Sequence, residues 1–258
     1  GCPYPCTFCD TPFKDIRLRS IPSVTDEIRQ AGPDNKTELY FWDETLNVSP
    51  KRFVELCEGL KPFDIPWSFR GRADRLDHDM LSQARDSGCY QMHIGLETIK
   101  DENLAFLKKE LTIDQVKRTL SDAKKLGIRV ILNLMIVMPF EKDERDIYEM
   151  VRRVIDLNPY LLQLNVFRPE PGTEIFEYGV SRGVLDWEPW NNYVLDPYKK
   201  FSPKTWDEHI PQDAVGRIWQ KSYQMFYFRP AKISALLFGL RSFWEFKQKF
   251  LNGVHLFK

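Results

Sequence analysis

Three of the five cysteines lie together at the start of the chain, in the stretch GCPYPCTFCDTPF. With the spacing C-x3-C-x2-C, they are Cys2, Cys6 and Cys9. A structural zinc site takes four ligands, so zinc would need a fourth from Asp10, a distant histidine, or Cys57 or Cys89. A disulfide inside the stretch would leave one thiol over. A cubane iron–sulfur cluster held by three thiolates leaves one iron open, which a catalytic cluster needs.

Polar residues end several of the predicted strands, at the edge where a parallel sheet binds its ligands. Asp43 and Glu44 close the aromatic stretch TELYFWDE, and Glu97 closes YQMHIGLE. Asp43 and Glu44 also fit the flank of a helix N-terminus. Glu97 is the stronger candidate, because a carboxylate at the end of a buried strand needs partners. Core packing is instead the expected role of His93, Cys57 and Cys89.

The elements that must position these residues alternate between strand and helix patterns. Strands are predicted over 37–44, 67–74, 90–97, 128–139 and, followed by a loop, 160–174. Helices are predicted over 49–60, 77–89, 101–107, 112–126 and 143–157. Such alternation is typical of βαβ units and predicts an α/β fold built on a parallel sheet.

Beyond residue 175 this alternation stops. Aromatic residues and prolines dominate 185–211, and a helix is predicted over 212–228. Over 231–252 the apolar residues gather near one face of a helix; they are Ile233, Leu236, Leu237, Leu240, Trp244 and Leu251. That helix is expected to pack on the domain or, alternatively, to lie on a membrane surface. We therefore expect a domain over 1–180 and a mostly helical extension over 181–258, which either helps to enclose the substrate or covers the exterior.

Composition limits the partners and the cellular location that are expected for the protein. The 258 residues include 37 Lys and Arg and 37 Asp and Glu, so the net charge is zero and no nucleic-acid partner is expected. No apolar run reaches the ~18 residues that span a bilayer. The few cysteines do not suggest a secreted disulfide framework, so a cytoplasmic location is expected. Because chain termini fray and this chain starts one residue before its first cysteine, we expect a preceding N-terminal part.

The cysteine stretch, with Phe8 directly before the last cysteine, resembles the cluster loop of the radical S-adenosylmethionine (SAM) superfamily. The resemblance implies a partial parallel (β/α)6 barrel, here without its first strand, because that strand precedes the loop in the family. It also implies that Cys2, Cys6 and Cys9 hold a [4Fe–4S] cluster. The open iron would chelate the amino and carboxylate groups of SAM, and Phe8 would lie near the adenine.

Five residues further along the chain fall at positions that the resemblance assigns to the cofactor. In YFWDE, Asp43 and Glu44 would face the methionine. Arg72 would end the third strand of the family barrel. Glu97 would end the fourth strand, at the position that holds the ribose hydroxyls. Lys109 lies where relatives often carry an arginine against the methionine carboxylate.

The stretch NLMIVMPFE, over 133–141, resembles the fifth strand of the family barrel. Asn133 matches a position on the ribose side. Val137 and Phe140 replace the two glycines that relatives usually carry in Gly-x-Pro-Gly-Glu, whereas Pro139 and Glu141 are retained. Because a side chain replaces each glycine, these two replacements affect how closely the backbone can approach the cofactor at this strand.

Two later stretches, PEPGTEIFE (169–177) and YQMFYFRPAKI (223–233), resemble cobalamin-dependent members, whose cobalamin-binding domain precedes the radical domain. The implied function is reductive cleavage of SAM and hydrogen abstraction, leading to methylation of an apolar natural product or lipid. A flavodoxin- or ferredoxin-type protein would donate the electron, and the C-terminal helix would allow peripheral membrane contact. The alternatives are a radical oxidase or cyclase, a methylthiotransferase, and a non-catalytic metal-binding module. No catalytic acid or base is indicated.

Overall fold

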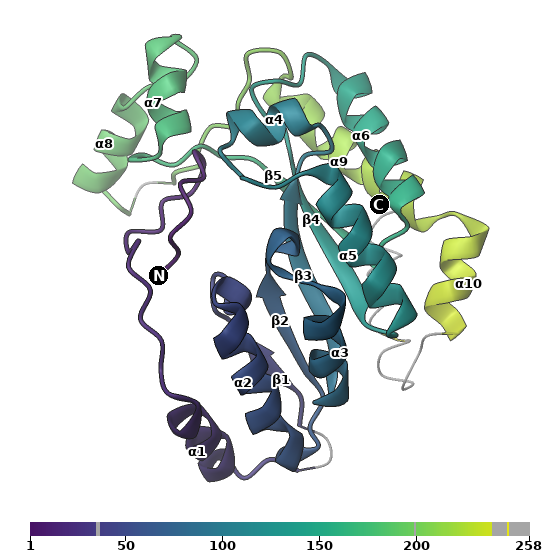
Figure 1. Ribbon diagram of the computed structural model, residues 1–258. Helices are drawn as coiled ribbons and strands as arrows, with labels where there is room; N and C mark the ends of the chain where they lie inside the picture. Colours follow the sequence, from purple (N-terminus) through teal and green to yellow (C-terminus); the bar gives the residue numbers. More distant parts are fainter. Residues whose placement is uncertain (35–36, 199, 239–246, 248–258) are drawn as a thin grey trace. The chain divides into compact units, whose positions relative to one another are not determined.

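The computed structural model describes residues 1–34, 37–198, 200–238 and 247. Within these residues, five strands form one sheet in the order β1-β2-β3-β4-β5 (Figure 1). Their bounds are Leu39–Phe41 (β1), Trp67–Gly71 (β2), Cys89–Glu97 (β3), Arg129–Ile136 (β4) and Leu161–Val166 (β5). The pairs β1–β2, β2–β3 and β3–β4 are parallel. The carboxyl ends of β1 to β4 therefore meet at the same edge of the sheet.

Helices alternate with the strands as far as β5, which confirms the predicted α/β pattern. Their bounds are Ile21–Ala31 (α1), Pro50–Leu60 (α2), His78–Asp86 (α3), Asp101–Phe106 (α4), Ile113–Lys125 (α5), Glu144–Leu157 (α6), Glu174–Ser181 (α7), Glu188–Leu195 (α8), Gln212–Tyr227 (α9) and Pro230–Phe238 (α10). Helices α1, α7 and α8 were not predicted from the sequence. For α1 both signals were present: the Ser20 side chain caps the first turn, and Gly32 ends the helix with φ 60°.

The two faces of the sheet differ in chemistry. One face carries the fully buried Trp67, Phe69, Met92, Ile94 and Leu96. α2 and α3 pack against each other on this face, and α5 packs on α3 (Figure 1). The ring centres of Phe53 in α2 and Phe69 in β2 are 5.2 Å apart. Because successive strand residues alternate between faces, the opposite face carries Ser68, Arg70, Gln91 and His93.

The chain divides into two compact units, and each is described by itself. The first unit is Gly1–Leu134, Pro159–Gln163 and Glu170–Tyr178. The second unit is Met135–Asn158, Leu164–Pro169 and Gly179–Lys258. The cysteine stretch and β1 to β3 belong to the first unit, whereas α6, α8, α9 and α10 belong to the second. The predicted domain boundary near residue 180 stays a prediction.

In the second unit, side chains of α9 cover the edge strand β5. The Trp219 Nε1–H donates to the Leu164 carbonyl at 3.1 Å, and the Leu164 N–H donates to the Tyr223 hydroxyl at 2.9 Å. α9 also packs on α6, where Arg217 pairs with Glu144 at 2.7 Å. These bonds satisfy backbone groups that an edge strand otherwise leaves open.

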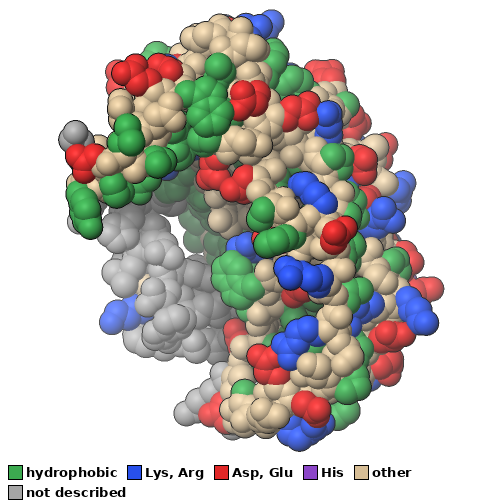
Figure 2. Space-filling view, turned by 90° about the vertical axis from the view of Figure 1, so that its left-hand side faces the viewer, with side chains coloured by type: hydrophobic (Ala, Val, Ile, Leu, Met, Phe, Trp, Pro, Cys, Tyr) green, Lys and Arg blue, Asp and Glu red, His purple; other side chains and the backbone are tan. Residues whose placement is uncertain are grey.

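Only the beginning of the predicted helix over 231–252 is described, as α10. Its residues Leu240, Trp244 and Leu251 lie outside the described part of the chain. In the described ranges, no helix has the length and apolar character needed to cross a membrane. Figure 2 shows acidic and basic side chains interspersed over the coloured right-hand part of the face that it displays.

Candidate active site

The cysteine loop is an irregular stretch of the first unit that backbone hydrogen bonds hold in place. The Cys9 N–H donates to the Cys6 carbonyl at 3.2 Å and closes a turn between these two residues. The Thr7 N–H donates to the Leu107 carbonyl at 3.0 Å, which anchors the loop just after α4. The thiols of Cys2, Cys6 and Cys9 are all free and half-buried. One short stretch therefore offers three sulfur donors.

Glu97 ends β3 in a strained backbone conformation. Its φ is 69°, and the Thr98 N–H donates to the Leu96 carbonyl at 2.9 Å, so Glu97 is the centre of a three-residue γ-turn. The register of β3 against β4 shifts between Gly95 and Glu97, which marks a bulge. Such strain costs about 1–3 kcal/mol and persists only where the surrounding structure holds it. Together, the bulge and the turn redirect the Glu97 side chain.

The redirected carboxylate forms a buried ion pair. Lys109 Nζ lies 2.8 Å from Glu97 Oε1, and the two side chains are 10% and 11% exposed. A Cβ added at Gly95 would come within 2.4 Å of Glu97 Oε1 and 3.1 Å of Lys109 Nζ, so the pair packs directly over the Gly95 backbone. Lys109 Nζ also lies 5.6 Å from the ring centre of Phe8. The fold thus brings together three of the predicted site residues: Phe8, Glu97 and Lys109.

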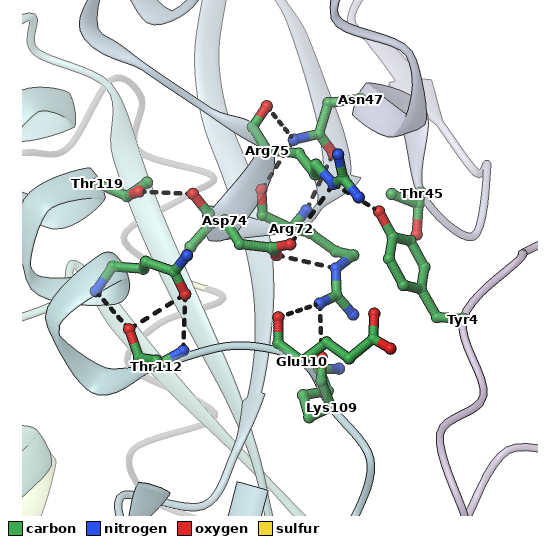
Figure 3. A network of polar contacts seen from close by, with 12 residues as sticks. Tyr4, Thr45, Asn47, Arg72, Asp74, Arg75, Lys109, Glu110, Thr112 and Thr119 are labelled. Carbon is green, nitrogen blue, oxygen red and sulfur yellow. Dashed lines mark hydrogen bonds and ion pairs between the residues drawn. The ribbon is translucent and has the colours of Figure 1, made fainter. Parts of the chain in front are cut away.

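Arg72 follows β2 and links the Lys109 segment to the cysteine loop. Its Nη2 donates to the carbonyl oxygens of Lys109 and Glu110 at 2.5 and 3.0 Å, and its Nε donates to Asp74 at 2.9 Å (Figure 3). The guanidinium carbon lies 3.7 Å from the centre of the Tyr4 ring. Arg72 is buried, so these contacts fix the positions of Tyr4 and Lys109 relative to each other.

Asn47, which was not predicted as a site residue from the sequence, completes this network. Asn47 follows β1 and is fully buried. Its Oδ1 accepts the Arg72 N–H at 3.0 Å, and its Nδ2 donates to the carbonyls of Arg72 at 2.8 Å and Arg75 at 3.2 Å (Figure 3). A polar side chain inside the apolar stretch Leu46–Val48 was the available signal. Asn47 ties the end of β1 to the end of β2.

The other predicted residues take less central places. Asp43 and Glu44 follow β1, and both are exposed. No hydrogen bond or ion pair found within the described ranges joins either side chain to Glu97 or Lys109. Asn133 is the register partner of Gly95, and its Nδ2 lies 3.5 Å from the Ile94 carbonyl. Asn133 therefore lies beside the strand position that the ion pair covers.

In the second unit, the end of β4 also combines a carboxylate with a strained backbone. Val137 has φ 67°, which a β-branched residue rarely adopts. Glu141 Oε2 accepts the N–H groups of Val137 at 2.5 Å and Met138 at 2.9 Å. The position where the family pattern carries glycine thus keeps a glycine-like conformation with valine, and the Glu141 carboxylate stabilises it.

Two cations act on the middle thiol of the loop. Burial raises the pKa of Cys6, while the charges of Lys109 and Arg72 lower it in part. A thiol ligates metal as the thiolate. Lys109 and Arg72 therefore favour the ligating form of Cys6.

A family model described as "Radical SAM superfamily" matches residues 1–154. The chain belongs to the radical SAM superfamily. The match includes the cysteine loop and both members of the Glu97–Lys109 pair, and it confirms the predicted membership. Enzymes of this superfamily use a [4Fe–4S] cluster and SAM.

Among curated proteins, this radical SAM chain is 25% identical over 237 residues to an uncharacterized methyltransferase of Pyrococcus horikoshii, covering 89% of the chain and 50% of the relative. It is 28% identical over 201 residues to the anaerobic magnesium-protoporphyrin IX monomethyl ester cyclase of Rubrivivax gelatinosus, covering 74% of the chain and 36% of the relative. The chain thus spans half or less of the length of these two relatives.

Among solved structures, the chain resembles the radical SAM methyltransferase TsrM of Kitasatospora setae with cobalamin and a [4Fe–4S] cluster bound. The TM-score is 0.64 at 18% identity, over 72% of this chain and 36% of that chain. At this identity the likeness concerns the fold alone. It confirms the predicted α/β partial-barrel architecture.

The donor set of the radical SAM loop fits a [4Fe–4S] cluster. Its three thiols are free and half-buried, and the positive charges of Lys109 and Arg72 act on Cys6. Among the residues that the structure describes, no group of three His, Cys, Asp or Glu side chains is arranged to hold a single metal ion. A cubane does not need that arrangement, because it presents a separate iron atom to each of the three thiolates.

Proposed function

We propose that this chain is the radical domain of an enzyme that cleaves SAM reductively and methylates an apolar natural product or lipid with the help of cobalamin. The observation that carries the proposal is the buried Glu97–Lys109 pair beside Phe8 of the cysteine loop. In this proposal Cys2, Cys6 and Cys9 hold the [4Fe–4S] cluster. When bound, the cluster supplies the electron that cleaves SAM, so that an adenosyl radical can take a hydrogen atom from the substrate.

The ion pair would place the two ends of SAM. Glu97 accepts hydrogen bonds from the ribose hydroxyls, and Lys109 donates to the methionine carboxylate. Each group now neutralises the other at 2.8 Å, so neither charge is left unpaired before SAM arrives. In the complex, the ribose hydroxyls would replace Lys109 as the partner of Glu97, and the methionine carboxylate would replace Glu97 as the partner of Lys109. Phe8 lies against the adenine and excludes water from that side.

Four further residues would act around this pair. Arg72 is a positioning residue, because its guanidinium both donates to the Lys109 carbonyl and lies over the Tyr4 ring. Asn133 lies on the ribose side, next to Gly95. Asp43 and Glu44, which are exposed after β1, would meet the methionine end of SAM.

Two similarities support the methyltransferase reaction and the use of cobalamin. Several curated relatives are named as methyltransferases, and a protein with the same fold was solved with cobalamin bound. Because the relatives are about twice as long or longer, we propose that a cobalamin-binding domain precedes this chain in the whole protein. A flavodoxin- or ferredoxin-type electron donor also belongs to this proposal.

Two alternatives keep the same radical chemistry. A cyclase reaction is favoured by the Rubrivivax relative, and methylthiotransferases also occur among the curated relatives. Coproducts separate methylation from cyclisation, and an added sulfur atom in the product marks methylthiolation, which would give the same coproducts as methylation. Cobalamin-dependent methylation would yield both 5′-deoxyadenosine and S-adenosylhomocysteine, because one SAM supplies the radical and a second supplies the methyl group. Cyclisation yields deoxyadenosine without S-adenosylhomocysteine.

Anaerobic reconstitution with iron and sulfide tests the radical class. We expect a brown protein that forms 5′-deoxyadenosine from SAM only when it is reduced. Cys2→Ala, Cys6→Ala and Cys9→Ala should each abolish iron retention, because no other ligand can replace a thiolate there. Cys57→Ala is the matched control, since this buried thiol lies in α2. Loss of iron in Cys57→Ala with retention in Cys2→Ala would contradict the assignment.

A further inference from the structure

Four side chains meet on the polar face of the sheet in the first unit, and we name them the ring–arginine cluster: Tyr40, Trp42, Arg70 and His93. The Arg70 Nε–H donates to the Tyr40 hydroxyl at 3.0 Å, and the guanidinium carbon lies 4.2 Å from the centre of a Trp42 ring. The Tyr40 ring centre is 4.7 Å from that of Trp42 and 5.6 Å from that of His93. Arg70 and His93 are also register partners in β2 and β3.

The ring–arginine cluster carries one positive charge, and no acidic side chain among the described residues pairs with it. Arg70 is exposed. Within the described residues it contacts the Tyr40 hydroxyl and the aromatic rings of Tyr40 and Trp42, and it forms no ion pair with a carboxylate. His93 adds no second charge, because burial and the nearby Arg70 lower its pKa to about 4. Trp42 is 69% exposed. A large aromatic surface and a cation are thus open on the same face.

This face leads to the Glu97–Lys109 pair. Gly95 follows His93 by two residues on β3, so both positions point to the same face, about 7 Å apart. A Cβ at Gly95 would run into the ion pair, which therefore stands above that face. A molecule lying on the ring–arginine cluster would therefore lie about two residues along β3 from the groups that are proposed to hold SAM.

We infer that the ring–arginine cluster binds the substrate, and that this substrate is a planar conjugated molecule carrying a carboxylate. Flat rings stack on exposed Trp and Tyr side chains, and a guanidinium fork binds a carboxylate through two parallel hydrogen bonds. The inference rests on the proposed function, because it takes the neighbouring ion pair as the SAM site. Under this inference, the apolar natural product of the proposed function is one that carries an anionic group at its edge.

Titration of the reconstituted chain with protoporphyrin IX and with its dimethyl ester tests the inference. Both probes have the same planar ring, but only the free acid has carboxylates. The wild-type chain should bind the acid about fivefold more tightly than the ester, a preference of the size expected for an exposed ion pair. Arg70→Gln should remove that preference, and Arg70→Lys should keep part of it. Trp42→Leu should weaken binding of both probes.

Arg29→Gln is the matched control. Arg29 also lies over a ring, with its guanidinium carbon 5.9 Å from the centre of Phe63, but its charge is already paired with Asp26. The control should bind both probes like the wild type. Equal affinity of the wild type for acid and ester, or an unchanged preference in Arg70→Gln, would overturn the inference. Tight binding of palmitate in place of protoporphyrin would overturn the planar part of it.

Formation of 5′-deoxyadenosine by the wild-type chain without substrate separates this inference from the proposed function. If SAM is cleaved but the acid is not preferred, the radical assignment stands and the substrate inference fails. If the acid is preferred but SAM is not cleaved, the ring–arginine cluster is a carboxylate-binding site and the proposed radical function fails.

Discussion

Glu97 carries two constraints at once, a positive φ of 69° and an ion pair with Lys109. Either constraint alone is costly, since the turn strains the backbone and burial removes water from both charges. Together they stabilise one arrangement, because the turn aims the carboxylate at the ammonium. Residues at functional sites commonly hold such strain, which places the side chain before a ligand arrives.

Gly95→Ala tests how tightly this arrangement is built. The new Cβ would lie 2.4 Å from Glu97 Oε1, so the ion pair must move. We expect SAM affinity, measured by calorimetric titration of the reconstituted protein, to fall about tenfold or more. Gly216→Ala in α9 is the control, because nothing lies within 4 Å of its added Cβ. It should leave affinity unchanged and raise the unfolding free energy by up to about 1 kcal/mol. Unchanged SAM affinity in Gly95→Ala would place SAM elsewhere.

His93 should make the protein sensitive to mild acid. Its pKa is lowered to about 4 by burial first and by Arg70 second, whereas the unfolded chain takes up the proton near the ordinary value of 6.5. Between pH 6.5 and pH 4 the unfolded state therefore binds more protons, and stability falls as the pH falls. Denaturant unfolding at pH 7 and pH 5 should show the wild type losing about 1 kcal/mol more than His93→Gln. His209→Gln, which alters an exposed histidine, should behave like the wild type.

At the scale of elements, the ends of β1 and β2 depend on one buried amide. Asn47 satisfies three backbone groups, the N–H and carbonyl of Arg72 and the carbonyl of Arg75. Arg72 in turn contacts Tyr4 of the cysteine loop and the Lys109 carbonyl. Through these contacts, the end of β2 fixes the positions of two loops that are distant from it in sequence.

Asn47→Ala should destabilise the protein by about 2–4 kcal/mol, because it leaves buried backbone groups without partners. Urea unfolding measures this loss. Asn191→Ala, at an exposed position in α8, should change stability by less than about 0.5 kcal/mol. If Asn47→Ala is equally neutral, water must replace the amide and the network does not determine the strand ends.

At the scale of the whole molecule, the sheet ends at β5, and α9 protects that edge with two aromatic side chains. The double variant Trp219→Phe/Tyr223→Phe keeps an aromatic ring at each position but removes the bonds to the Leu164 backbone. We expect it to self-associate at concentrations where the wild type does not, because an edge strand with open backbone groups pairs with other chains. Light scattering over a concentration series measures this. Trp190→Phe, whose ring packs on Phe201, is the control and should stay like the wild type.

Much of the fold could be predicted because its signals are local. Strand and helix periods, the Ser49–Pro50 helix start and the cysteine spacing all lie within short stretches of the chain. The missed helix α8 lies in the stretch over 185–211 that aromatic residues and prolines dominate, and α7 lies just before it, where the alternation of strands and helices stops. The apolar tail of the sequence suggested one long helix, but only Pro230–Phe238 of it lies in the described residues.

The sequence by itself determined which chemistry is available: three thiols on one loop, and a carboxylate at the end of a strand. Only the tertiary structure decided which side chains meet. Strand register places Arg70 beside Tyr40, 30 residues away, and the bulge in β3 turns Glu97 toward Lys109, 12 residues away. The physical reason is that register and turn geometry result from packing of the whole sheet. A local pattern can show that a polar residue ends a strand, but it does not show the partner that the neighbouring strand brings to it.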